Sequence, residues 1–171
     1  MDAVAILRSN LADAHWMLEQ TIEDVSPEHL HWVPPGSANP IASTYAHVLT
    51  SEDELVQGTF LARPLLINDE WKGRSGISLP VPQRGGDWYA WGRRVRVDIP
   101  AARSYAAAVY AATDDFLAGI ASDQLDRQPE LALPGNQTLG WLIYNLLTQH
   151  AALHTGEIAV LKGLQGLAGY R

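Results

Sequence analysis

The chain contains no cysteine among its 171 residues. This absence excludes disulfide bonds, zinc sites with cysteine ligands and catalysis by a cysteine nucleophile. Basic residues are also scarce, with 12 lysines and arginines against 19 acidic residues and a net charge of −7. A chain short of positive charge is unsuited to phosphate backbones and to anionic membranes. We therefore expect neither nucleic acid nor a membrane surface as its partner.

Long uninterrupted apolar runs are missing as well, so the sequence predicts no membrane span. Residues 1–6 lack the basic residues and the apolar stretch of a signal peptide, which leads us to expect a cytoplasmic protein. Hydrophobic residues make up 47% of the chain, enough for a sizeable core. We see no internal repeat and no low-complexity segment, and we expect a single domain over residues 1–171.

Four segments carry apolar residues at the three- and four-residue spacing of amphipathic helices. The expected helices cover about residues 2–23, 40–61, 99–120 and 138–165, and a short helix begins at Ser26. Ser26, Asp98 and Thr138 stand where helix N-caps belong, and Pro134-Gly135 marks a turn. Residues 77–81 are the only, weak, strand candidate. The sequence therefore predicts an all-α fold, a four-helix bundle.

The connection between the second and third expected helices, about residues 64–97, is long, irregular and rich in proline and glycine. It contains Trp71, Trp88 and Trp91, which favour packing over disorder, and a short helix is expected over residues 87–91. The tryptophans could wall an apolar pocket. The alternatives are that they cap one end of the bundle or lie at a dimer interface.

Arg93, Arg94 and Arg96 form the only basic cluster of the sequence, directly after the tryptophans. If the cluster borders a cleft, it would bind the carboxylates of a substrate or cofactor. The alternative is a solvated charged face.

Two histidines of the last expected helix, His150 and His154, are four residues apart and so point the same way. At 100° per residue, they and Glu157 fall at the centre of the apolar stripe. Buried imidazoles need partners, and a shared metal ion is the simplest one. The alternative is a pair of core histidines bonded to backbone or water. The zincin motif is excluded, because it requires a glutamate at the position of Ala151.

A third ligand must come from another helix, and His47 is the best choice. It shares a helix face with Thr44, Ser51 and Glu54, away from the apolar stripe, so a metal would require a cleft at the side of the bundle. An exposed surface histidine is an equally good interpretation. His15, near the packing face of the first helix, is the reserve ligand. Three neutral imidazoles and one open position are typical of catalytic zinc.

Two carboxylates are the candidate catalytic residues. Glu157 would serve as a fourth ligand, a general base or a partner that orients a ligand, or else forms a salt bridge to a neighbouring helix. Glu52 falls inside the apolar stripe of the second helix, which is unusual for an acid. It would orient a ligand or a substrate, unless it is a paired structural carboxylate.

Two segments carry a resemblance to a known family, His47-Val48-Leu49-Thr50-Ser51-Glu52-Asp53 and His150-Ala151-Ala152-Leu153-His154-Thr155-Gly156-Glu157-Ile158. In order and spacing they resemble the DinB-like superfamily over nearly the whole chain. The resemblance implies an up-down-down-up four-helix bundle, often a homodimer, with zinc or nickel on His47, His150 and His154. Characterised relatives include transferases and isomerases that use the thiols mycothiol or bacillithiol. The family commonly has glutamine in place of Glu157.

The leading hypothesis is therefore an enzyme whose metal lowers the pKa of a thiol or water for attack on a small electrophilic substrate. Because the chain has no cysteine, the thiol must come from outside. A metal-dependent hydrolase is the enzymatic alternative. Two non-enzymatic functions also fit the sequence: a metal-binding or stress-response protein without catalysis, and a binding module that uses only the tryptophan-lined cleft.

Overall fold

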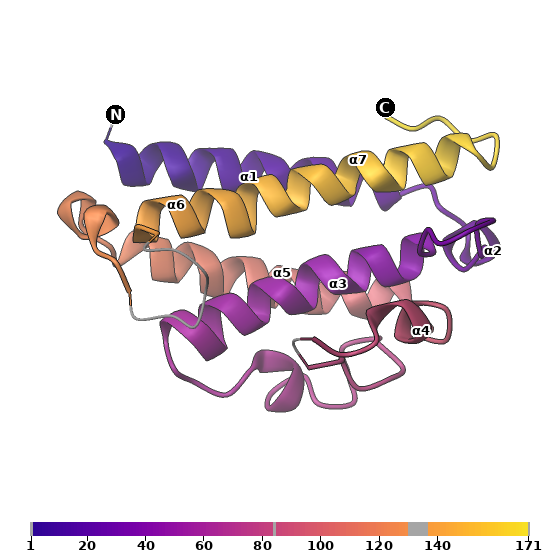
Figure 1. Ribbon diagram of the computed structural model, residues 1–171, viewed down its shortest axis with the longest axis horizontal. Coiled ribbons are helices and arrows are strands. Elements are labelled where there is room, and N and C mark those ends of the chain that lie inside the picture. The colour runs from indigo at the N-terminus through magenta and orange to yellow at the C-terminus, as the bar shows by residue number, and fades with distance from the viewer. Residues whose placement is uncertain (1, 84, 130–136, 171) are drawn as a thin grey trace.

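The computed structural model describes residues 2–83, 85–129 and 137–170. Its helices are α1 (Ala3–Ile22), α2 (Pro27–Leu30), α3 (Ile41–Asp53), η1 (Glu54–Phe60), η2 (Leu66–Asn68), α4 (Trp88–Gly92), α5 (Ile99–Ala118), η3 (Ser122–Asp126), α6 (Leu139–Ile143), η4 (Tyr144–Gln149) and α7 (His150–Gly163). Because η1 continues α3 and η4 joins α6 to α7, the four long expected helices are present (Figure 1). None of the helices formed by the described residues combines the length and the apolar character needed to cross a membrane.

The ends of the helices follow local sequence signals. Asp98 accepts a hydrogen bond from the backbone N–H of Ala101 at 2.9 Å, and Thr138 accepts one from Trp141 at 3.2 Å. Ser26 caps α2 in the same way, so the three predicted N-caps are confirmed. The weak strand prediction at residues 77–81 is wrong, because this segment makes only an isolated bridge between Ile77 and Val97. The expected turn at Pro134-Gly135 lies outside the described residues.

The four long helices pack in a ring, in which α1 and α3 each contact both α5 and α7 (Figure 1). Their buried apolar side chains form two clusters along the bundle. One contains Leu18, Ile22, Tyr45, Leu49, Val109, Ile158 and Leu161, and the other Leu11, Val56, Leu117, Ile143 and Leu147. A polar layer lies between the two clusters along α1, α3 and α5. In it the carboxylate of Glu52 contacts His15 Nε2 at 2.8 Å and accepts the Thr113 hydroxyl at 2.7 Å.

α3 is buried on nearly every side, since the bundle covers one face and the connection before α5 covers another. The connection is attached through Asp53, which is only 1% exposed. Its carboxylate accepts the backbone N–H groups of Leu66 and Ile67 at 3.0 Å each and the Tyr105 hydroxyl at 2.7 Å. The start of the connection is therefore held to α3 and α5 by one buried, fully bonded carboxylate.

A glycine fixes the later part of the connection against the first turn of α5. Gly76 has φ +74° and accepts a hydrogen bond from the Asp98 N–H at 2.9 Å. A Cβ atom at Gly76 would lie 2.6 Å from the Asp98 carbonyl oxygen and 2.8 Å from the Ala102 nitrogen. Only glycine supplies both this conformation and this close approach.

Gly76→Ala should therefore destabilise the protein by about 3 kcal/mol or more, because strain and a backbone clash add. Gly73→Ala is the matched control: Gly73 has φ +72°, but a Cβ there meets nothing within 4 Å. We expect it to cost only about 1 kcal/mol. Urea unfolding of both variants measures the difference, and equal losses would show that the connection does not pack tightly on α5.

Candidate metal centre

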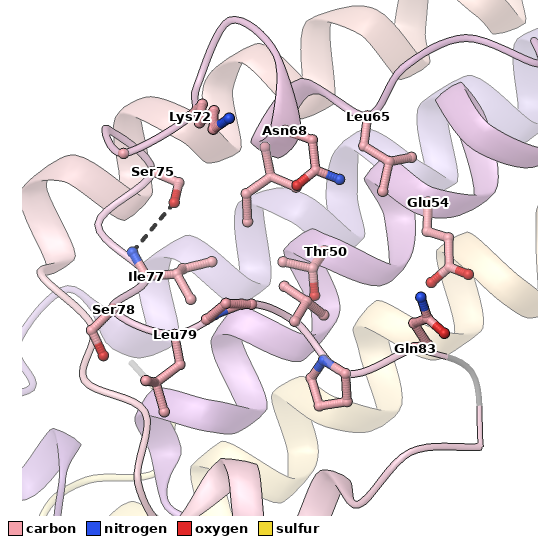
Figure 2. A pocket seen from close by; sticks show the side chains of 15 residues that line it. Thr50, Glu54, Leu65, Asn68, Lys72, Ser75, Ile77, Ser78, Leu79 and Gln83 are labelled. Carbon is pink, nitrogen blue, oxygen red and sulfur yellow. Dashed lines mark hydrogen bonds between the residues drawn. The ribbon is translucent and has the colours of Figure 1, made fainter.

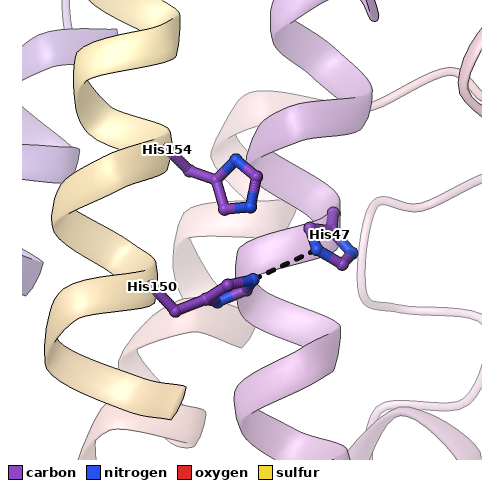
Figure 3. A group of neighbouring side chains, drawn as sticks. All are labelled: His47, His150 and His154. Atoms are coloured by element: carbon purple, nitrogen blue, oxygen red, sulfur yellow. Dashed lines mark hydrogen bonds between the residues drawn. The ribbon is translucent and has the colours of Figure 1, made fainter. Parts of the chain in front are cut away.

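Three imidazoles from two helices meet at one side of the bundle (Figure 3). His47 extends from α3, and His150 and His154 extend from successive turns of α7. The Nε2 atoms of His47 and His150 are 3.1 Å apart, and one nitrogen from each histidine lies within 4.8 Å of the other two. The ring centroids are 4.6–5.0 Å apart, with the rings nearly perpendicular. The predicted convergence of these histidines is therefore present.

The spacing of two of these nitrogens matches that of two donors to one divalent cation. In a tetrahedral zinc site with Zn–N bonds of about 2.0–2.1 Å, two nitrogens lie about 3.3 Å apart. The His47–His150 separation of 3.1 Å is close to that value. Without a cation, two neutral ring nitrogens at this distance must share one proton, whereas a cation satisfies both lone pairs. A three-histidine site of this kind could hold a divalent metal.

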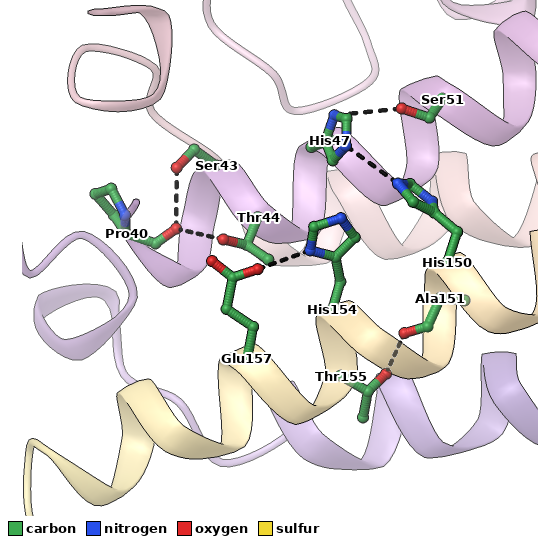
Figure 4. A network of polar contacts seen from close by, with 10 residues as sticks. All are labelled: Pro40, Ser43, Thr44, His47, Ser51, His150, Ala151, His154, Thr155 and Glu157. Atoms are coloured by element: carbon green, nitrogen blue, oxygen red, sulfur yellow. Dashed lines mark hydrogen bonds and ion pairs between the residues drawn. The ribbon is translucent and has the colours of Figure 1, made fainter. Parts of the chain in front are cut away.

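Polar side chains contact the Nδ1 atoms of His154 and His47 (Figure 4). His154 Nδ1 donates to the Glu157 carboxylate at 2.7 Å, which leaves its Nε2 lone pair free. Ser51 Oγ lies 3.3 Å from His47 Nδ1. Sequence reasoning gave Ser51 no role, although its spacing of four residues from His47 on one helix places it within reach.

Burial keeps two of the imidazoles neutral. It lowers the pKa of His47 to about 4 and that of His150 to about 3, and the nearby His154 shifts both pKa values in the same direction. Glu157 opposes the shift at His47, but less strongly. Neutral imidazole is the form that binds metals, so these two donors are prepared for a cation well below neutral pH.

A cavity of about 130 Å³ lies beside the histidines. Its lining residues are Asn39, Ser43, Thr44, His47, Trp88, Trp91, His154 and Glu157. Trp88 contacts the His47 ring edge-on, with centroids 4.8 Å apart. Of the three tryptophans, for which a pocket wall was one of several alternatives, Trp88 and Trp91 line this cavity, whereas Trp71 packs near Tyr105 with ring centroids 5.9 Å apart.

The histidines of α7 do not lie at the centre of its buried face, and that prediction is wrong. The buried residues of η4 and α7 are Leu147, Thr148, Ala151, Thr155, Ile158, Ala159, Leu161 and Lys162. Leu153 and Leu164, which a regular helical wheel places in the same stripe as these histidines, are 66% and 64% exposed. The π-helical η4 directly precedes His150 and interrupts the step of 100° per residue on which the expectation was based. The imidazoles lie at the edge of the buried face, toward α3.

His47 is half-buried in a cleft lined by the polar edge of α3. This is the position that a metal ligand on its helix face would need. The other carboxylate candidate, Glu52, is 2% exposed and is bonded through both oxygens to His15 and Thr113. Its contacts are those of a paired structural carboxylate. They also pair His15, the reserve ligand, with a carboxylate outside the three-histidine group.

The arginine cluster does not line the cavity beside the histidines. Arg93 donates to the carbonyl oxygens of Gly36 and Ala38 and stacks over Tyr89 at 4.5 Å. Arg94 and Arg96 are exposed. Their role in cofactor binding stays a prediction.

The fold and the site define a helical bundle with a candidate metal centre between two facing helices. More particularly, the chain belongs to the DinB superfamily, whose family model matches residues 11–158. The crystal structure of a conserved protein from Enterococcus faecalis is similar, with a TM-score of 0.81, 18% identity, and coverage of 96% of this chain and 97% of that chain. This likeness shows the fold. No curated protein matches the chain.

The metal-free protein should lose stability as the pH falls from 7.5 to 5. In the unfolded chain these imidazoles titrate near 6.5, whereas the folded pKa values are about 4 for His47 and about 3 for His150. The unfolded state therefore binds more protons across this range, and acid favours it. His150→Gln should lose about 2 kcal/mol less than the parent protein, measured by urea unfolding in the presence of a chelator. Equal losses would contradict a buried neutral His150.

Proposed function

We propose that this protein is a metal-dependent enzyme that activates an external thiol, or water, for transfer to a small electrophilic substrate. The observation that carries the proposal is the convergence of His47, His150 and His154 beside a small cavity. Bound zinc or nickel would lower the pKa of a coordinated thiol or water and so supply a nucleophile at neutral pH. The chain has no cysteine, so a low-molecular-weight thiol of the mycothiol or bacillithiol kind comes from outside.

The chain's own residues would hold and shield this centre. His47, His150 and His154 are the proposed ligands, and Glu157 fixes the orientation of His154. Glu157 lines the cavity, and its Oε1 makes no hydrogen bond to a described residue, so this oxygen is the proposed acceptor of a proton from an incoming nucleophile. Trp88 and Trp91 exclude water from one wall. A catalytic role for Glu52 has less support, because both of its oxygens are bonded elsewhere.

Water is the second candidate nucleophile. The cavity of about 130 Å³ has room for several water molecules and is lined by hydroxyl, amide and carboxylate groups. This observation supports a metal-dependent hydrolase. Incubation of the zinc-loaded protein with an electrophile in the presence and absence of thiol separates the two, since only hydrolysis proceeds without thiol.

We also propose the up-down-down-up order of the superfamily for α1, α3, α5 and α7, within one domain over residues 1–171. A homodimer is the proposed assembly. Exposed apolar side chains on the neighbouring helices α1 and α7 support it: Trp16 is 63% exposed, Leu153 66% and Val160 64%.

The tag-free protein should bind about one Zn²⁺ or Ni²⁺ per chain, and His47→Ala, His150→Ala or His154→Ala should reduce this well below one. Each substitution removes one of three donors and leaves the two apolar clusters intact, so helicity by circular dichroism should change little. His29→Gln is the matched control, because His29 lies outside the group. Elemental analysis measures the metal content. A parent protein that takes up neither ion would refute the proposed function.

Glu157→Leu should weaken metal binding by about 10- to 100-fold, because His154 Nδ1 loses its acceptor. Glu157→Gln should weaken it much less, since an amide oxygen can still accept the bond. Competition with a chromogenic chelator measures both affinities. If Glu157→Leu binds zinc as tightly as the parent, the carboxylate does not support the metal centre.

A further inference from the structure

A second cavity, of about 720 Å³, lies between α3 and the connection that covers it (Figure 2). This volume is typical of small-molecule sites. Thr50 and Glu54 contribute from the helix, and the remaining lining comes from residues 65–83. The cavity shares no lining residue with the smaller one beside the histidines.

The walls of this cavity are held by contacts already made in the fold. The segment at Leu66 and Ile67 is bonded to the buried carboxylate of Asp53. On the other side, the Ser78 N–H donates to the Arg96 carbonyl at 3.0 Å. A site whose walls are fixed in this way binds a ligand without first having to order its own backbone.

The lining combines aliphatic side chains with hydroxyl and amide groups. Its aliphatic members are Leu65, Ile67, Ile77, Leu79 and Val81, together with two prolines. These five side chains are only partly buried, although all of them line the same hollow. An apolar ligand body would remove them from water together, which the protein alone does not do.

Two opposite charges complete the lining. Lys72 and Glu54 are both exposed, and neither forms an ion pair with a described residue. They lie on different sides of the cavity (Figure 2). The charges therefore complement a ligand with a carboxylate at one end and an amine at the other.

We propose that this cavity binds an elongated zwitterion, an ω-amino carboxylate or a short apolar peptide, with its carboxylate at Lys72 and its amine at Glu54. Thr50 and Glu54 follow His47 by three and seven residues, about 4.5 Å and 10 Å along the helix axis. The cavity therefore continues the face of α3 that carries His47. The binding of this ligand to the cavity does not depend on the proposed function. Its role as the substrate of the metal centre rests on the proposed function.

Three compounds with the same number of carbon atoms test the proposal by calorimetry on metal-free protein: 8-aminooctanoate, octanoate and octylamine. We expect 8-aminooctanoate to bind at least tenfold more tightly than the other two, because only it satisfies both charges. Lys72→Gln should weaken 8-aminooctanoate and octanoate but not octylamine, and Glu54→Gln should weaken 8-aminooctanoate and octylamine but not octanoate. Arg127→Gln, a change of one charge outside the cavity, is the matched control and should leave all three affinities unchanged.

If the protein binds none of the three compounds, the proposal is overturned. Affinities that neither Lys72→Gln nor Glu54→Gln changes would overturn it as well. The zinc content of Lys72→Gln is measured in parallel and should equal that of the parent protein. Zinc uptake without zwitterion binding refutes this inference alone. Zwitterion binding to a protein that takes up no metal refutes only the proposed function.

Discussion

The burial of α3 from two sides is the constraint on which the rest of this structure depends. A helix enclosed in this way has little solvent-exposed face, so most of its polar side chains must find a partner within the protein. Glu52 finds His15 and Thr113 in the layer between the apolar clusters, and Asp53 finds the backbone of the connection. His47 projects into the remaining gap and meets the α7 imidazoles there. The position of His47 within the histidine group therefore follows from how α3 is enclosed.

The hydrogen bonds of these polar residues also determine which of them can be substituted without a large loss of stability. Breaking a buried, bonded pair from one side leaves a charge or dipole without compensation, which costs about 3–5 kcal/mol for an ion pair. The Glu52 layer joins α1, α3 and α5 between two apolar clusters, so it fixes the relative height of three helices. It therefore fixes the height of His47 on α3 relative to α1 and α5.

Helix positions and N-caps were predictable because each depends on residues close in sequence, whereas spacing alone left His47 open between a cleft and an exposed surface. Asp98 caps α5 by a contact three residues away, and the polar face of His47 is set by its own helix. The burial of α7 was not predictable, since a regular wheel does not contain the η4 turn before His150. Nor was the partner of Glu52, because Thr113 is 61 residues distant and is placed there only by the packing of α5 on α3.

The connection between α3 and α5 lines both cavities, because it is attached to the bundle at two places. Its first part, held by Asp53, walls the larger cavity, and its helix α4 walls the smaller one through Trp88 and Trp91. Within the first part, Gly76 packs closely against the backbone of α5 and accepts the Asp98 N–H, which attaches the connection to α5. The two cavities are thus built on neighbouring turns of α3 by one segment with fixed attachments. A change that loosens the connection would disturb both cavities, whereas the α7 histidines are positioned independently by the bundle.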